Sequence, residues 1–206
     1  SAWATVVTWN LNPSGSNGAV GSNSQTFSSS GYNVTAYGYT VSSPNTPLGL
    51  YFKSQGSNAT GLGIVGPANH ELQGSGSLPE QFIQLDVSSI IAQGFSDGKL
   101  EVGSVGSNDK FAIWGSSTLG DPGQQIGGTY NSSSNMVFIS LADFSSYNYI
   151  SIGALSGGVL PAAFQASLSA VPEVSALFPI VGLIIAVSLT QFLRRRRMAQ
   201  LRGGSR

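Results

Sequence analysis

The residues whose types and spacing could support chemistry are the consecutive Asn69, His70 and Glu71, together with Asp86 farther along the chain. Carboxylate and carbonyl oxygens are the ligands that Ca²⁺ prefers, so Asn69, Glu71 and Asp86 could form a calcium site between loops of a sheet domain. The alternative is that Glu71 and Asp86 accept hydrogen bonds from backbone N–H groups at turns, as acidic side chains often do. The sequence has no D-x-D-x-D-G loop that would favour calcium, and no other cofactor is expected.

The remaining polar residues do not predict a catalytic function. His70 is the only histidine and cysteine is absent, so a thiol nucleophile is excluded and a zinc site of the usual ligand set is not expected. None of the Gly-rich stretches ends in Gly-Lys-Ser/Thr, the motif that holds a phosphate. We therefore predict a non-enzymatic protein with no catalytic residues. The enzymatic alternative is a secreted hydrolase with paired carboxylates, because spacing in sequence does not fix spacing in space.

Three aromatic residues suggest a binding surface of another kind. Tyr37 and Tyr39 share one face of a strand predicted over Tyr32–Val41, and Trp114 lies on another predicted strand. Aromatic rings arranged in this way could form a platform on which sugars stack, as in β-sandwich carbohydrate modules. The same rings could instead pack across strands and stabilise the sheet.

Short strands separated by turn residues must position these groups. The pattern of β-branched, aromatic and turn residues predicts strands at residues 5–11, 32–41, 49–53, 61–65, 81–87, 99–105, 110–114, 136–141, 149–155 and 159–169. We expect Gly106–Asp109 to join two of them as a β-hairpin, and Ser88–Gln93 to form one helical turn capped by Ser88. No long amphipathic helix is predicted before residue 174, so a parallel α/β fold is not expected. The predicted fold is all-β, an antiparallel, jelly-roll-like β-sandwich.

The charge of the chain is divided between two parts. The first 173 of its 206 residues contain three Lys, no Arg and nine Asp or Glu, so their net charge is 3 − 9 = −6. The residues that follow contain six Arg and no acid, a net charge of +6. Binding to nucleic acid depends on clustered cations, so the acidic body argues against nucleic acid as a partner.

The C-terminal segment contains a long uncharged apolar run. Val174–Leu193 has no Asp, Glu, Lys, Arg or His over 20 residues, and Arg194, Arg195, Arg196 and Arg197 follow it directly. A helix of this length spans roughly 30 Å, the thickness of the hydrocarbon core of a bilayer. We therefore predict a single transmembrane helix at 174–193. The arginines would stay in the cytoplasm under the positive-inside rule, which places the N-terminal domain outside it.

The order of features around this run is more specific than that of an ordinary membrane span. Val171, Pro172 and Glu173 form a short motif directly before the apolar residues, and the arginines follow them. This order resembles the PEP-CTERM sorting signal of bacterial exported proteins, which membrane enzymes called exosortases recognise. The resemblance implies that the helix is a temporary anchor and that the chain is cut near Pro172 and Glu173. Val174 stands where that motif usually has its last proline, a departure that bears on the exosortase subtype.

The body of the chain also resembles the ectodomains often found ahead of this signal, in blocks such as Leu50–Lys53, Asn69–Leu72 and Phe82–Asp86. This resemblance implies a location outside the cell rather than a particular activity. In addition, Ala2-Trp3-Ala4 has the A-x-A form of a signal-peptidase site, which suggests an N-terminal export signal.

These observations together predict a chain of two parts. Residues 1–170 form an exported β-sandwich domain, and residues 171–206 form a sorting signal made of the motif 171–173, the helix 174–193 and the tail 194–206. The predicted function is that of a cell-surface or extracellular-matrix protein, anchored first in the inner membrane and then released by an exosortase. The alternative is a carbohydrate-binding module of the envelope or exopolysaccharide. The expected partners are the exosortase, membrane lipid before processing and, in the alternative, exopolysaccharide.

Overall fold

The structure is a computed structural model that describes residues 4–42, 44–76 and 79–168. Ala4–Ser169 form one compact unit, and the described part of it is all-β with antiparallel sheets. The strands are β1 (Thr5–Asn10), β2 (Gly18–Ala19), β3 (Ser24–Ser29), β4 (Tyr32–Thr40), β5 (Thr46–Leu48), β6 (Leu50–Ser54), β7 (Thr60–Ile64), β8 (Leu72–Ser75), β9 (Gln81–Asp86), β10 (Phe95–Gly103), β11 (Lys110–Ser116), β12 (Gln124–Tyr130), β13 (Phe138–Ser140) and β14 (Tyr149–Leu168). The helices are α1 (Ser88–Ala92) and two short 3-10 helices, η1 (Ser132–Ser134) and η2 (Phe144–Ser146).

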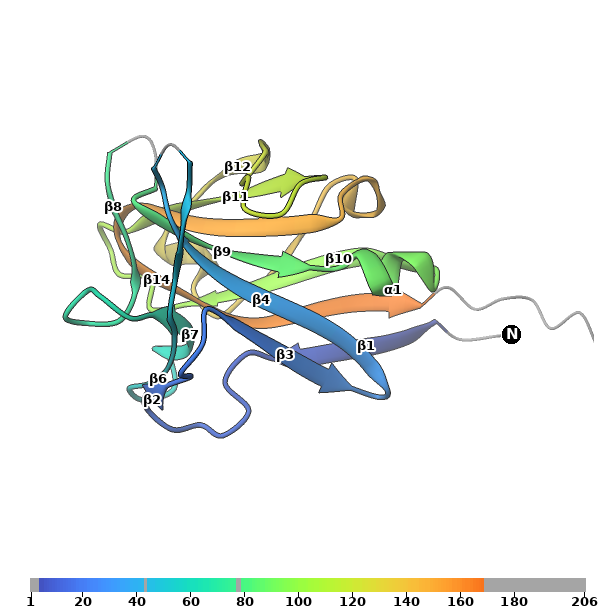
Figure 1. The fold of residues 1–206 in the computed structure, drawn as a ribbon, viewed down its shortest axis with the longest axis horizontal. Helices are drawn as coiled ribbons and strands as arrows, with labels where there is room; N and C mark the ends of the chain where they lie inside the picture. Colours follow the sequence, from blue (N-terminus) through green and yellow to red (C-terminus); the bar gives the residue numbers. More distant parts are fainter. Residues whose placement is uncertain (1–3, 43, 77–78, 169–206) are drawn as a thin grey trace, which may run out of the picture. The chain divides into compact units, whose positions relative to one another are not determined.

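Both layers of the fold are built around β14, a strand of 20 residues. Its first half pairs with β11 on one side and with β9 on the other, its middle at residues 156–159 pairs with β8, and its second half pairs with β1 and β10. Gly157 lies between the halves with a φ of 68°, a left-handed conformation that glycine adopts without strain. Figure 1 shows β14 running through one layer, reversing near β7 and returning through the other. One layer has the order β12-β11-β14-β9-β4-β3, and the other contains β13, β10, β14 and β1.

Alternating side chains of the two layers meet in a hydrophobic core. On β4, Val34 and Ala36 are buried, as the period of two in the sequence predicts. From the other layer, the Trp9 ring packs against Phe95 and Phe164, with ring centroids 5.9 and 5.6 Å away. Tyr32 of β4 contacts Phe95 across the layers, with ring centroids 4.7 Å apart. Full burial of a large apolar side chain contributes about 1.5–3 kcal/mol, so this core stabilises the stacked layers.

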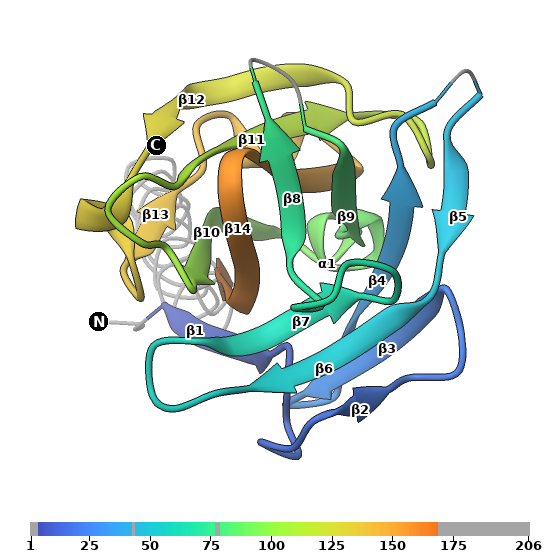
Figure 2. The same cartoon turned by 90° about the vertical axis from the view of Figure 1, so that its left-hand side faces the viewer.

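A small sheet of β2, β6 and β7 covers one end of the layers (Figure 2). Gly61 of β7 lies so close to the Pro161 backbone of β14 that a side chain would have no room. The buried Asn12 side chain, just after β1, donates hydrogen bonds to the carbonyl oxygens of Lys53 and Ser16 at 2.8 and 3.2 Å. The bend of β14 and the end of β1 thereby fix the position of β6.

The two ends of the described chain lie together at the opposite end of the domain. Thr5 pairs with Leu168 in the antiparallel register of β1 and β14. Figure 1 shows the start of β1 and the end of β14 at the end of the layers that is far from β2, β6 and β7. The six residues of β1, at about 3.3 Å each, separate the two ends of the domain by roughly 20 Å.

The loop between β11 and β12 covers part of the outer face of the first layer. Gln84 of β9 donates from Nε2 to the Asp121 carbonyl oxygen at 2.8 Å and to Ser151 Oγ at 3.2 Å. Its Oε1 accepts from the Gly120 N–H at 2.6 Å. Because both ends of this buried amide are satisfied, the loop is held against the sheet.

The predicted fold, a jelly-roll-like sandwich followed by a transmembrane helix, is corrected by the structure. The two layers belong to one 11-stranded sheet because β14 passes through both. None of the helices formed by residues 4–42, 44–76 and 79–168 is long and apolar enough to cross a membrane. The run at 174–193, for which the sequence predicts a helix, lies outside the described residues, as do the motif 171–173 and the tail 194–206.

The hairpin predicted at Gly106–Asp109 is also wrong. β10 pairs with β13 and the second half of β14, whereas β11 pairs with β12 and the first half of β14. Ser104 has a φ of 62°, and the segment that follows it crosses between the layers. The helical turn α1 is present, but its N-cap is Val87, and Ser88 donates from its N–H and Oγ to the Asp86 carboxylate at 3.0 and 2.6 Å.

Candidate functional site

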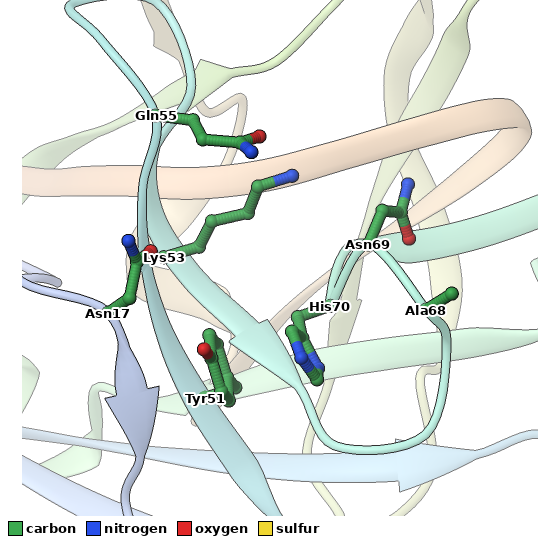
Figure 3. Close-up of a pocket in the computed structure, with 7 residues that line it drawn as sticks. All are labelled: Asn17, Tyr51, Lys53, Gln55, Ala68, Asn69 and His70. Carbon is green, nitrogen blue, oxygen red and sulfur yellow. The ribbon is translucent and has the colours of Figure 1, made fainter.

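A polar hollow of about 470 Å³ lies beside the small sheet. Its walls come from the segment before β2, from β6 and the residue after it, and from the loop between β7 and β8 (Figure 3). The lining residues are Asn17, Tyr51, Lys53, Gln55, Ala68, Asn69 and His70. Figure 3 shows the Lys53 side chain extending from β6 toward the opposite wall, which carries Asn69 and His70.

A buried ion pair joins one wall of the hollow to the interior. Lys53 Nζ lies 2.7 Å from Glu71 Oε1, and the two side chains are 8% and 10% exposed. The Ser104 hydroxyl donates to the same carboxylate oxygen. Removing two charges from water costs several kcal/mol for each, so such a pair is stable only where its remaining polar atoms are also hydrogen-bonded.

Asn69 completes the hydrogen bonding of this carboxylate. Its Nδ2 donates to Glu71 Oε2 at 2.7 Å, so both carboxylate oxygens have donors. Its Oδ1 accepts from the Glu71 N–H at 3.3 Å and from Gln73 Nε2 at 3.1 Å. One buried carboxylate therefore contacts both a lysine ammonium and a primary amide.

An aromatic stack forms another part of the wall. The rings of Tyr51 and His70 lie 3.7 Å apart between centroids, with 13° between their planes. The φ of His70 is 57°, a left-handed conformation that costs a non-glycine residue roughly 1–3 kcal/mol. Within the described part of the chain, its Nδ1 is the one buried side-chain nitrogen or oxygen without a hydrogen-bond partner. Strain and an unsatisfied nitrogen in one residue are typical of functional sites.

Two glycines leave room for this arrangement. A Cβ at Gly63 would overlap the His70 carbonyl oxygen, and a Cβ at Gly158 would overlap Glu71 Oε2. Without a Cβ, glycine lets the backbone approach its neighbours this closely. The turn between β7 and β8 is closed by the His70 N–H, which donates to the Pro67 carbonyl oxygen at 3.0 Å. The sequence of β7 and the bend of β14 therefore position the carboxylate.

Of the three predicted calcium ligands, the structure brings together Asn69 and Glu71 but not Asp86. Glu71 lies beside the bend of β14, whereas Asp86 pairs with Tyr149 at the start of that strand. Asp86 accepts hydrogen bonds from Ser88, as the turn interpretation predicts. Within residues 4–42, 44–76 and 79–168, no cluster of three or more His, Cys, Asp or Glu could hold a metal ion.

The three aromatic residues considered as a glycan platform do not form an open surface. Tyr39 and Trp114 are each 8% exposed. The Tyr39 ring stacks on Phe82 with centroids 5.1 Å apart, and Gly120 of the covering loop lies against it. Burial raises the pKa of Tyr39, with a smaller contribution from the neighbouring Tyr37 phenol. Tyr39 and Trp114 therefore pack in the sheet, in agreement with the alternative interpretation.

Lys53 and Tyr51 are site residues that the sequence analysis missed. They are two residues apart on β6, so both side chains lie on the same face of the strand. A signal was present, because a lysine that follows Leu50-Tyr51-Phe52 in a short strand needs an acidic partner if it is buried. The partner itself could not be identified, since it lies 18 residues away beyond another strand.

The predicted sorting residues, Val171, Pro172 and Glu173 with the arginines at 194–197, lie outside the described residues. No protein-family model matches the chain, and no curated protein matches its sequence. The site is therefore interpreted from its own geometry.

Proposed function

We propose that the chain is a non-enzymatic exported protein of the cell surface or extracellular matrix. The β domain is the delivered part, and residues 171–206 are a sorting signal processed by an exosortase-type enzyme. The observation that carries this proposal is the sequence order of Pro172-Glu173, an uncharged apolar run and four consecutive arginines. The arginines support it, because a block of Arg directly after an apolar run favours keeping that end in the cytoplasm during export.

The position of the end of β14 is compatible with attachment of the domain, and its later release, at the C-terminal end. β14 ends at Leu168, beside the start of β1 and at the end of the domain opposite the hollow (Figure 1). A chain that is attached or cut beyond Leu168 would leave the hollow, roughly 20 Å away along β1, free to face the surroundings.

Fractionation of bacterial cells that produce the full-length chain tests this function. We expect the wild-type domain outside the cells and a variant with Pro172→Ala and Glu173→Ala retained at full length. Glu80→Ala, a change of an exposed acid in the domain, is the matched control and should be released normally. Wild-type protein that remains in the cytoplasm, or release of the motif variant at the wild-type level, would contradict the proposal.

A second candidate function is carbohydrate binding. The hollow supports this candidate, whereas the buried face that contains Tyr39 and Trp114 does not. The Tyr51–His70 stack offers a flat aromatic wall, and the Gln55 and Asn69 amides line the same space. A sugar presents an apolar face and several hydroxyl groups, which such a combination of ring and neutral polar side chains can bind.

Affinity electrophoresis in gels containing the exopolysaccharide of the producing bacterium tests this second candidate. Tyr51→Ala should lose the retardation that the wild-type domain shows. Tyr130→Ala is the matched control, because Tyr130 also stacks on another ring, with centroids 5.3 Å apart, but lies outside the hollow. Equal migration of wild type with and without polysaccharide, or equal loss in both variants, would rule out the hollow as the binding site.

A further inference from the structure

Lys53, Glu71 and Asn69 form a constellation whose buried ion pair neither proposed function uses. The chain has no cysteine, so no disulfide can cross-link this domain. We propose that Lys53 Nζ and Asn69 Cγ become joined by an intramolecular isopeptide bond, with Glu71 as the acid–base group of the reaction.

Glu71 is placed to serve both reacting groups. Its Oε1 lies 2.7 Å from Lys53 Nζ, and its Oε2 accepts from Asn69 Nδ2 at 2.7 Å. One carboxylate therefore holds the nucleophile and the leaving group, each hydrogen-bonded to one of its two oxygens. Holding two reactants in this way removes much of the entropic cost of bringing them together.

The reaction balances without any further reagent. Lys53 Nζ passes a proton to Glu71, and the neutral amine attacks Asn69 Cγ to form the new C–N bond. Nζ then loses a second proton, and the bond between Cγ and Nδ2 breaks. Glu71 relays both protons to the departing nitrogen, which leaves as ammonium, and the carboxylate is restored. No oxidant or reductant takes part.

The Asn69 carbonyl oxygen already has two hydrogen-bond donors. The Glu71 N–H and Gln73 Nε2 donate to Oδ1 at 3.3 and 3.1 Å. This oxygen carries the negative charge of the tetrahedral intermediate, and donors that are in place beforehand stabilise such a charge. The network around Asn69 therefore resembles an oxyanion hole directed at the carbon under attack.

The reacting pair is enclosed by protein, and the hollow opens beside Asn69. Lys53 and Glu71 are largely buried, and proton transfer between them replaces two buried charges by two uncharged groups. The released ammonium can leave through the hollow, because Asn69 lines the hollow. The new bond would tie β6 to the loop before β8 across residues 54–68.

Mass analysis of the purified full-length chain, unfolded and digested with a protease that cleaves after lysine, tests the proposal. In the wild type we expect an intact mass lower by one ammonia and no cleavage after Lys53. Asn69→Ala and Glu71→Gln should keep the full sequence mass and be cleaved there. Gln55→Ala is the matched control, since Gln55 lines the same hollow without contacting the carboxylate, and it should form the bond.

Asn69→Asp gives an independent check on the chemistry. In this variant the bond forms with loss of water, and the product has the same mass as the wild-type product. A folded wild-type chain with the full sequence mass and normal cleavage after Lys53 would overturn the proposal. Bond formation in Glu71→Gln at the wild-type rate would overturn the role assigned to Glu71.

Discussion

In a chain that also carries Asn69→Ala, and so cannot form the Lys53–Asn69 bond, replacing Glu71 by alanine is expected to destabilise the domain by about 3–5 kcal/mol, the usual cost of removing one partner from a buried ion pair. The Lys53 ammonium would remain about 8% exposed without a counterion, and the Ser104 hydroxyl would lose its acceptor. Asn69 is exposed, so water can replace its hydrogen bond to Glu71, and we expect Asn69→Ala in the reference chain to contribute little.

The double variant with Lys53→Met and Glu71→Ala isolates the unpaired charge. Neither this variant nor Glu71→Ala alone can form the Lys53–Asn69 bond, so the cross-link does not affect the difference between them. Methionine fills much of the lysine stem without a charge. We expect the double variant to be more stable than Glu71→Ala by about 2 kcal/mol or more.

Urea unfolding followed by tryptophan fluorescence measures these differences, because Trp9 and Trp114 are buried in opposite layers. The free energy of unfolding follows from the transition midpoint and the slope m, which should be similar in the three proteins. A Glu71→Ala domain within about 1 kcal/mol of the Asn69→Ala reference would refute the reasoning, as would a double variant less stable than the single one.

Three further outcomes are expected. Gly63→Ala should lower the melting temperature in thermal unfolding, because its Cβ would overlap the His70 carbonyl oxygen. Trp9→Ala should reduce the free energy of unfolding in urea by about 3–5 kcal/mol, since the ring is 1% exposed and packs on Phe164. Burial raises the pKa of Tyr39 above its ordinary 10.0, so its contribution to stability is present below pH 10 and falls as the pH rises through the folded-state pKa. Unfolding measured across alkaline pH should show this fall, and Tyr39→Phe should reduce it.

Local patterns in the sequence predict much of the sheet. The alternation on β4 places Val34 and Ala36 in the core, as the structure shows. The two strands predicted at 149–155 and 159–169 are instead the halves of β14, because Gly157 bends the strand without ending it. The hairpin at Gly106–Asp109 was predicted from turn residues, which specify a turn but not which strands pair on either side of it.

The site was only partly predictable, for a related reason. Asn69 and Glu71 are neighbours in the sequence, so their association could be inferred from their spacing. The partner assigned to them, Asp86, lies at the other end of the first layer, and the real partner Lys53 comes from β6. Contacts of this kind depend on how the small sheet packs across the bend of β14, which the local pattern does not encode.

The intact mass of the protein recovered from outside the cells that produce it tests the proposed function most directly. The proposed function predicts a chain that ends near Glu173 and therefore lacks the arginines at 194–197. A full-length chain that retains those arginines and is found only inside the cells would contradict it.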